Sequence, residues 1–172
     1  MIENPYYATC NNISSLYVAR KYLENAIILD GDQIICNERI LISEFCRSGY
    51  NSVWTFEETD EWLQTVKDGI VTACSRVGGG CGWQLYSISR WTAEDGRKLK
   101  KHLELEFEQK HNTQIYWDDI VMFCHSQEYQ LGIFEMQPDD VIEIDSLEEL
   151  ISIDNNYVKY SCLLYTSDAA DE

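Results

Sequence analysis

Short apolar runs alternate with amphipathic segments along most of the chain. Residues 14–24 predict a helix, because their apolar positions recur every three to four residues behind a serine that can cap the first turn. Residues 26–29 are wholly apolar, which is typical of a strand buried on both faces in a sheet covered by helices. A second helix is expected from Glu38 to Cys46. This order of helices and strands predicts an α/β fold.

The middle of the chain has the alternating pattern of antiparallel strands. Two β-type runs, at 62–66 and 70–74, are joined through an Asp-Gly pair. Such a pair between two β-type runs is a strong signal for a hairpin. Further strand-like runs at 52–56 and 83–88 flank the hairpin. The sequence therefore predicts an antiparallel hairpin inserted into the α/β order.

Two capping boxes mark helix starts in the second half of the chain. The first, Thr92–Asp95, is expected to open a helix that runs to about Lys110. The second, Ser146–Glu149, is expected to open a terminal helix that ends near Ile153. The remaining patterned segments, one helix and two strands, are at 115–125, 132–136 and 141–144.

Composition and charge exclude several classes of protein. The chain has 13 basic and 30 acidic residues among 172, so its net charge is −17, which argues against a nucleic-acid partner. No apolar run approaches the ~20 residues of a membrane-spanning helix, and no secretory signal follows Met1. The seven cysteines form no C-x-x-C pair, which favours reduced thiols over a zinc site. We therefore expect a cytoplasmic protein without a membrane partner.

The pattern of the chain changes after Tyr160. The segment 161–172 contains Cys-Leu-Leu-Tyr-Thr-Ser-Asp-Ala-Ala-Asp, which is what a sequencing-library adapter gives when it is translated. We therefore expect 161–172 to be an adapter-derived, non-native tail and exclude it from reasoning about the fold. A genuine but disordered C-terminus is the alternative.

Carboxylates follow two of the predicted strands. Asp30-Gly31-Asp32 comes directly after the first apolar strand, and Asp145 follows the last strand. Ligands bind at the carboxyl ends of strands in open α/β sheets, and paired carboxylates hold hard cations such as Mg²⁺. These residues indicate a candidate metal site. The alternatives are a polar turn for the first group and a helix-capping acid for Asp145.

Aromatic rings stand beside acids in two segments, Tyr116–Asp119 and Asp60–Trp62. Ring faces next to carboxylates suit a quaternary ammonium group, because the rings supply cation–π attraction and the acids add charge. The alternative is ordinary core packing for the rings and a solvated surface for the acids.

Several segments together resemble the bacterial phosphocholine cytidylyltransferases of the sugar-nucleotidyltransferase-like superfamily. The segments that carry the resemblance, in order, are Asn4–Tyr7, Asn11–Ala19, Ile27–Gln33, Asp60–Trp62, Tyr116–Asp119 and Glu143–Ser146. The match runs from about Ile2 to Tyr157 and is especially like the module that some anaerobic bacteria fuse to a choline kinase-like domain. It implies a Rossmann-like α/β/α sheet of the glycosyltransferase-A-like type.

The resemblance also implies a reaction and its metal site. The family transfers CMP from CTP to phosphocholine and releases pyrophosphate. By this match Asp32 and Asp145 are the catalytic ligands of Mg²⁺, and Asp30 is an auxiliary ligand or lies just behind them. The acceptor's phosphate oxygen is already anionic at neutral pH, so positioning and charge neutralisation supply the rate without a general base.

The choline pocket is implied in the same way. Trp62 and Tyr116 match aromatic walls of the pocket, and Asp118 matches an acid that faces the ammonium. Glu143 lies two residues before Asp145, so on a strand it points to the same side and can join that pocket.

One departure from the family concerns the N-terminus. The family begins with a strand, a Gly-rich loop that ends in a basic residue and a Pro-Lys element, which grip CTP, and nothing here matches them. We therefore expect residues 1–160 to be a partial nucleotidyltransferase domain from a longer parent, with the N-terminal strand and Gly-rich loop missing. Such a fragment is expected to be inactive as it stands.

Two rival functions stay open at this point. A sugar-1-phosphate nucleotidyltransferase or a D-x-D glycosyltransferase shares Asp32 and the metal but binds sugar hydroxyls instead of using Trp62 and Tyr116. A non-catalytic choline-binding module keeps the aromatic pocket but needs neither Asp32 nor Asp145.

Overall fold

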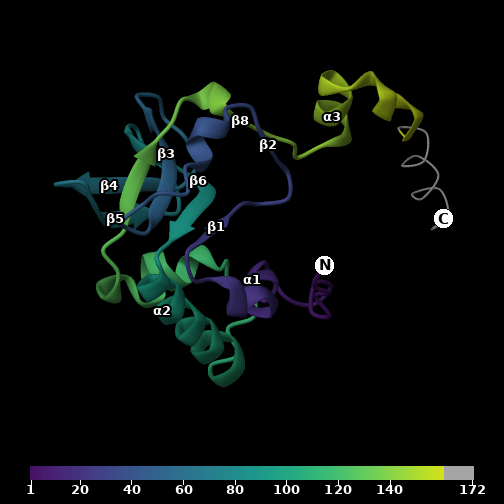
Figure 1. The fold of residues 1–172 in the computed structure, drawn as a ribbon. Coiled ribbons are helices and arrows are strands. Elements are labelled where there is room, and N and C mark those ends of the chain that lie inside the picture. The colour runs from purple at the N-terminus through teal and green to yellow at the C-terminus, as the bar shows by residue number, and fades with distance from the viewer. Residues whose placement is uncertain (161–172) are drawn as a thin grey trace. The chain divides into compact units, whose positions relative to one another are not determined.

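The computed structural model describes residues 1–160, which fall into two compact units (Figure 1). Unit 1 consists of Met1–Leu29 and Glu38–Pro138, and unit 2 consists of Asp30–Asn37 and the chain from Asp139 onward. The proposed adapter-derived tail at 161–172 lies outside the described residues. Within the described part, no helix has both the length and the apolar character to cross a membrane.

A six-stranded mixed sheet forms the framework of unit 1. Its strands are β1 (Ala26–Ile28), β3 (Gly49–Thr55), β4 (Leu63–Lys67), β5 (Ile70–Ser75), β6 (Gly82–Trp91) and β7 (Gly132–Glu135). The order is β5-β4-β6-β3-β7, and β1 pairs with β6. β3 runs antiparallel to β6 and parallel to β7. This sheet, with its helices, confirms the predicted mixed α/β class.

The predicted hairpin is confirmed as β4 and β5. Asp68 and Gly69 form its turn with φ of 51° and 75°. Positive φ at both central residues is the requirement of a type I′ turn, and Asp-Gly meets it at low steric cost. The hairpin is attached to the rest of the sheet through β4, which pairs with the first part of β6.

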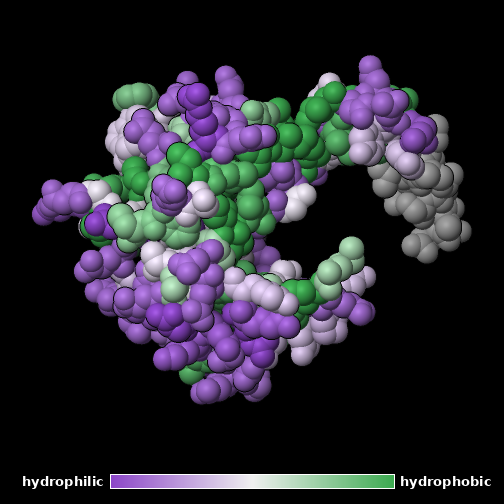
Figure 2. Space-filling view, viewed as in Figure 1, coloured by the Kyte–Doolittle hydropathy of each residue, from purple (hydrophilic) through white to green (hydrophobic). Residues whose placement is uncertain are grey.

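Two helices pack against each other beside this sheet (Figure 1). They are α1 (Ile13–Ala19), which continues as a 3₁₀ turn at Arg20–Tyr22, and α2 (Ala93–Glu104), which continues as a π-helical turn at Leu105–Gln109. Leu16 of α1 and Leu99 and Leu103 of α2 are buried. The outer surface over α2 is hydrophilic (Figure 2). Both helices therefore have the amphipathic character that the sequence predicts.

The start of α2 is capped differently from the expected box. Thr92 accepts a hydrogen bond from the Asp95 N–H at 3.2 Å, as predicted. The Asp95 carboxylate, however, accepts from Ser48 Oγ at 2.7 Å, and the Thr92 N–H donates to the same Ser48 hydroxyl at 3.0 Å. Ser48 therefore inserts into the capping box and ties the start of α2 to the residue before β3.

The helix expected from Glu38 to Cys46 is wrong apart from a single 3₁₀ turn at Glu38–Leu41. The buried guanidinium of Arg90 donates to the carbonyls of Ile40 and Ile42, the latter at 3.1 Å. A helix would need these carbonyls for its own ladder, so a side chain distant in sequence replaces the expected helical bonds.

The helix expected at 115–125 is confirmed in its second part, as a continuous helical stretch at 118–124. A π-helical turn, η4, spans Ile120–Cys124, and a 3₁₀ turn, η5, spans Ser126–Glu128. Ile120 and Val121 of η4 are buried against the core.

Unit 2 contains a two-stranded antiparallel sheet and a short helix. Its elements are β2 (Gln33–Ile35), β8 (Val141–Glu143) and α3 (Leu147–Ile153). The predicted box at the start of α3 is confirmed, because Ser146 and Glu149 bond each other's backbone N–H groups reciprocally. β2 was not expected from the sequence, whereas β8 was.

Candidate functional site

Trp62 and Tyr116 meet in unit 1, as the resemblance implies. Their ring centroids lie 6.0 Å apart at 87°, an edge-to-face arrangement. The ring of Phe123, in η4, also packs edge-to-face with Trp62, with ring centroids 5.4 Å apart at 73°. We call these three rings, with Asp118, Asp119 and Arg76, the aromatic–acid cluster. It brings together the residue before β4, the residue after β5 and the chain at 116–123.

Local backbone bonds position the two predicted aromatic walls. The Trp62 carbonyl accepts from the Leu85 N–H at 2.8 Å, which holds the residue before β4 against β6. The Tyr116 N–H donates to the Asp119 carboxylate at 2.9 Å. Trp117 is buried in the core, so its neighbour Tyr116 is directed outward and is 51 % exposed.

Asp118 and Asp119 are buried, which contradicts a solvated surface for the acids of this segment, whereas Asp60 and Glu61 are exposed, as that alternative expects. Asp118 is 5 % exposed and Asp119 is 4 % exposed. Burial, and then the negative charge of Asp118, raise the pKa of the interior Tyr50 well above its ordinary value. Burial and the same carboxylate raise the pKa of the Cys74 thiol to about 12. The interior around Asp118 is therefore electronegative and favours a nearby cation.

Arg76 supplies that cation, and sequence reasoning missed it. Its Nη2 lies 2.5 Å from Asp119 Oδ1, and its guanidinium carbon lies 3.9 Å from the ring centroid of Phe123 and 5.9 Å from that of Trp62. Asp119 was noted only as part of a segment, whereas the structure makes it the direct partner of Arg76. A lone arginine after a strand has no periodic signal that could have identified it.

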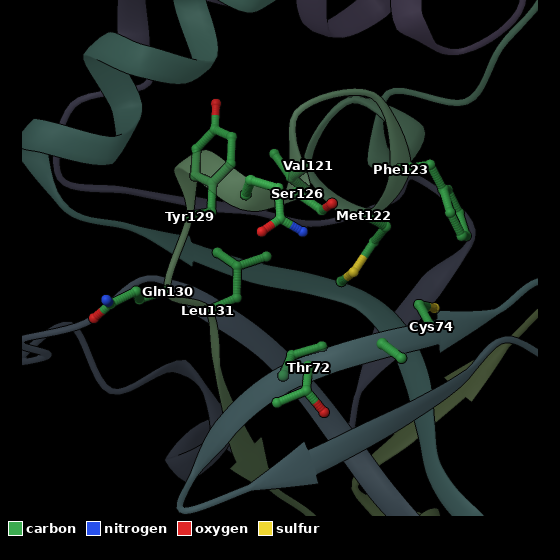
Figure 3. Close-up of a pocket in the computed structure, with 12 residues that line it drawn as sticks. Thr72, Cys74, Val121, Met122, Phe123, Ser126, Tyr129, Gln130 and Leu131 are labelled. Carbon is green, nitrogen blue, oxygen red and sulfur yellow. The ribbon is translucent and has the colours of Figure 1, made fainter.

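A cleft of about 540 Å³ adjoins the aromatic–acid cluster in unit 1. Figure 3 shows Thr72 and Cys74 of β5 on one side and Met122 of η4 on the other. Phe123 stands at one end of the cleft and also carries the Arg76 guanidinium on its face. The cleft and the cluster therefore share a wall.

The two predicted metal acids lie at the same end of the two-stranded sheet of unit 2. Asp32 immediately precedes β2, and Asp145 follows β8 after one residue. The Ile144 N–H donates to the Asp32 carbonyl at 2.9 Å and so extends the pairing of Gln33 with Glu143. Both aspartates are exposed. Exposed oxygen donors on adjoining strand ends fit the preference of Mg²⁺ for one or two carboxylates together with water.

The remaining predicted residues of unit 2 have other surroundings. Glu143 accepts a hydrogen bond from Gln33 Nε2 across the sheet at 3.0 Å. Among residues 1–160, Asp30 does not complete a three-carboxylate group with Asp32 and Asp145 in which all ligand atoms lie within 4.8 Å. Trp62, Tyr116 and Asp118 belong to unit 1, whereas Asp30, Asp32, Glu143 and Asp145 belong to unit 2.

A different group, not predicted, has metal-ligand composition. His102, His125 and Glu128 have ligand atoms within 4.8 Å of one another. The two imidazole rings are stacked at 3.9 Å and 4°, so their in-plane lone pairs cannot both point at one ion without rotation of a ring. The outer nitrogens bond Glu106 at 2.8 Å and Tyr129 at 2.7 Å. The group is a hydrogen-bonded junction between α2 and the turns η4 and η5.

Comparison with solved structures identifies the fold of the chain. No family model matches the chain. A solved structure of CTP:phosphocholine cytidylyltransferase from Streptococcus pneumoniae has a TM-score of 0.77 at 25% identity, and covers 88% of this chain and 66% of that one. A putative glucose-1-phosphate thymidylyltransferase from Bacillus anthracis has 0.55 at 12%, covering 74% and 53%. The inositol-1-phosphate CTP transferase from T. maritima has 0.56 at 13%, covering 80% and 56%. The fold is that of the nucleotidyltransferases.

Sequence comparison adds two relatives, both of which are cytidylyltransferases. The chain is 29% identical over 160 residues to the 2-aminoethylphosphonate cytidylyltransferase of Lancefieldella rimae, which covers 92% of this chain and 65% of the relative. It is 26% identical over 149 residues to the choline-phosphate cytidylyltransferase of Streptococcus pneumoniae, covering 87% and 64%. The chain thus spans slightly less than two thirds of these curated relatives. The chain is thus similar in sequence to cytidylyltransferases, as the resemblance implied.

Proposed function

We propose that the protein to which this chain belongs transfers CMP from CTP to phosphocholine. The observation that carries the proposal is the aromatic–acid cluster, where Trp62 and Tyr116 stand beside two buried aspartates. A trimethylammonium group donates no strong hydrogen bond, so ring faces and nearby negative charge are what can select it. The choline-phosphate relative supports the same acceptor.

Within this proposal the aromatic rings bind and orient the acceptor. Trp62 and Tyr116 form walls for the methylated nitrogen, and Asp118 adds negative charge. Because an anionic phosphate oxygen is the nucleophile, no side chain has to remove a proton. The oxygen forms a bond to the α-phosphorus of CTP while the bond to pyrophosphate breaks.

The metal belongs to the proposal as well. Asp32 and Asp145 would hold Mg²⁺ with Asp30 close behind them, and the ion would neutralise charge on the reacting phosphates. In this chain Asp32 lies directly before β2 and Asp145 lies just after β8, beside the backbone hydrogen bond from Ile144 to Asp32.

Isothermal titration of the chain with phosphocholine and with glucose 1-phosphate tests the acceptor assignment. We expect phosphocholine to bind more tightly, and Trp62→Ala to weaken it by about 0.5–2 kcal/mol, or roughly 2- to 30-fold. Trp54→Ala is the matched control, because Trp54 is a partly exposed tryptophan of the same unit that packs on Trp83 rather than on an acid. Tighter binding of glucose 1-phosphate would instead favour the sugar-1-phosphate nucleotidyltransferases.

Isothermal titration with Mg²⁺ separates the enzyme from a non-catalytic choline-binding module. The enzyme is expected to bind Mg²⁺, and Asp32→Asn should remove most of that binding while choline recognition is retained. Asp139→Asn removes the same charge from another exposed aspartate of unit 2 and should leave Mg²⁺ binding unchanged. Equal Mg²⁺ binding in both variants would contradict the metal assignment.

A second acceptor follows from the other relative. 2-Aminoethylphosphonate, named for the Lancefieldella rimae protein, also joins a cationic nitrogen to a phosphorus acid. The cluster offers acids that can accept hydrogen bonds from a primary ammonium. Titration with this compound beside phosphocholine ranks the two.

A further inference from the structure

Arg76 places the chain's own cation inside the aromatic–acid cluster. The guanidinium lies over Phe123 at 3.9 Å, contacts Asp119 at 2.5 Å and lies 5.9 Å from the Trp62 ring centroid. The Arg76 side chain is half exposed, while that of Asp119 is 6 % exposed. One end of this ion pair is therefore fixed in the interior, and the other can move toward solvent.

The backbone around Arg76 is held in place by its turn. Ser75 Oγ donates to the Gly78 carbonyl at 2.8 Å, and Thr59 and Gly79 exchange two backbone hydrogen bonds of 3.0 Å. Gly78 has φ of 68°, and a Cβ there would lie 1.7 Å from the Thr59 carbonyl oxygen. The turn thus fixes where the arginine side chain begins and leaves the side chain itself as the movable part.

The features that hold Arg76 are the ones that a substrate ammonium would use. A guanidinium and a trimethylammonium both bind the faces of aromatic rings and both are stabilised by a carboxylate. We propose that Arg76 is an internal competitor for the acceptor's cationic group: it occupies Asp119 and the ring faces when the site is empty, and the ligand displaces it. This inference rests on the proposed function, because it assigns the cationic group to this cluster.

The charges of the cluster give the direction of the effect. Arg76 is paired with the buried Asp119, and the neighbouring Asp118 is a second buried acid of the cluster. Removal of the guanidinium leaves Asp119 Oδ1 for the ligand and frees the face of Phe123. Arg76 therefore lowers the affinity of the cluster for a cationic ligand. Only a cation that binds the rings and Asp119 strongly enough displaces the guanidinium.

The test uses two probes of the same shape and different charge. Choline and its neutral isostere 3,3-dimethylbutan-1-ol are titrated into the wild-type chain, Arg76→Gln and Arg76→Lys. Choline should bind Arg76→Gln about 3- to 30-fold more tightly than the wild type, a range set by the strength of single cation–π and ion-pair contacts. Arg76→Lys keeps the charge and should stay near the wild-type value. The neutral isostere should bind all three chains alike.

A second measurement covers the case in which Arg76→Gln unfolds because Asp119 loses its partner. In the wild-type chain, saturating choline should shift the ¹⁵Nε resonance of Arg76, which Arg76→Lys identifies by its absence. A resonance that stays in place while choline binds would overturn the inference.

The remaining outcomes also decide between the inference and the proposed function. If Arg76→Gln binds choline no more tightly than the wild type, Arg76 has only a structural role. If the variant gains the same affinity for choline and for the neutral isostere, Arg76 only fills space in the site. In either case phosphocholine binding that depends on Trp62 still supports the proposed function. If neither folded chain binds choline or phosphocholine, the proposed acceptor and the inference fall together.

Discussion

At the scale of single residues, the sequence identified the rings of the site better than its charges. Trp62 and Tyr116 were implied by resemblance and lie in contact. Arg76 and Asp119 form the closest charged contact of the cluster, yet neither was singled out. Their pairing depends on a hairpin and a turn meeting in space, and no local pattern encodes such a meeting.

Gly49 provides a prediction at this scale. A Cβ on Gly49 would lie 2.1 Å from the Gly132 carbonyl oxygen, because β3 and β7 approach closely at that pair. Gly49→Ala should therefore lower the free energy of unfolding by about 1–3 kcal/mol, as expected for forced overpacking against backbone. Urea denaturation measures it. Gly80→Ala, where a Cβ meets nothing within 4 Å, is the control, and equal losses in both variants would refute the steric explanation.

At the scale of elements, local chemistry predicted the parts that local bonds stabilise. The hairpin at Asp68-Gly69 and the capping box at Ser146 are both confirmed, since their turn and cap are formed by neighbouring residues. The expected helix from Glu38 does not form, because Arg90, far along the chain, donates hydrogen bonds to the carbonyls of Ile40 and Ile42. Sequence periodicity contains no record of such a distant donor.

The junction between α2 and the turns η4 and η5 leads to a pH prediction. Burial, and then the charge of His125, lower the pKa of His102 below its ordinary value of 6.5, and Glu128 opposes this only in part. The folded chain thus binds fewer protons at this site than the unfolded chain. The contribution of neutral His102 to the free energy of unfolding is present above about pH 6.5. It is lost as the pH falls through that value toward the lowered pKa.

Urea unfolding between pH 7.5 and 5.5 measures this effect. The free energy of unfolding should fall with pH, and His102→Gln should flatten the slope. His111→Asn, at an exposed histidine outside the junction, should keep the wild-type slope. Glu106 and Glu128 also have lowered pKa values, but from an ordinary 4.5, so their losses begin below this window. An unchanged slope in His102→Gln would show that His102 is not the titrating group.

At the scale of the whole molecule, fold class was accessible from sequence and strand order was not. The alternation of helices and strands predicted an α/β protein, and the nucleotidyltransferase structures share its fold. The order β5-β4-β6-β3-β7 pairs strands across long stretches of chain, for example β3 with β7. Periodicity within one segment says nothing about its partner. The candidate metal acids were likewise predicted as strand-end carboxylates, but their place at the same end of one small sheet depends on β2, which the sequence did not predict.

In the proposed function, Trp62 and Tyr116 receive the cationic group of the acceptor. Intermolecular nuclear Overhauser effects from the N-methyl protons of phosphocholine test it most directly, because they report which rings the trimethylammonium touches. We expect cross-peaks to the ring protons of Trp62 and Tyr116 and none to Trp54 and Trp83, which form a separate aromatic pair in unit 1. Cross-peaks to Trp54 and Trp83 in place of Trp62 and Tyr116 would contradict it.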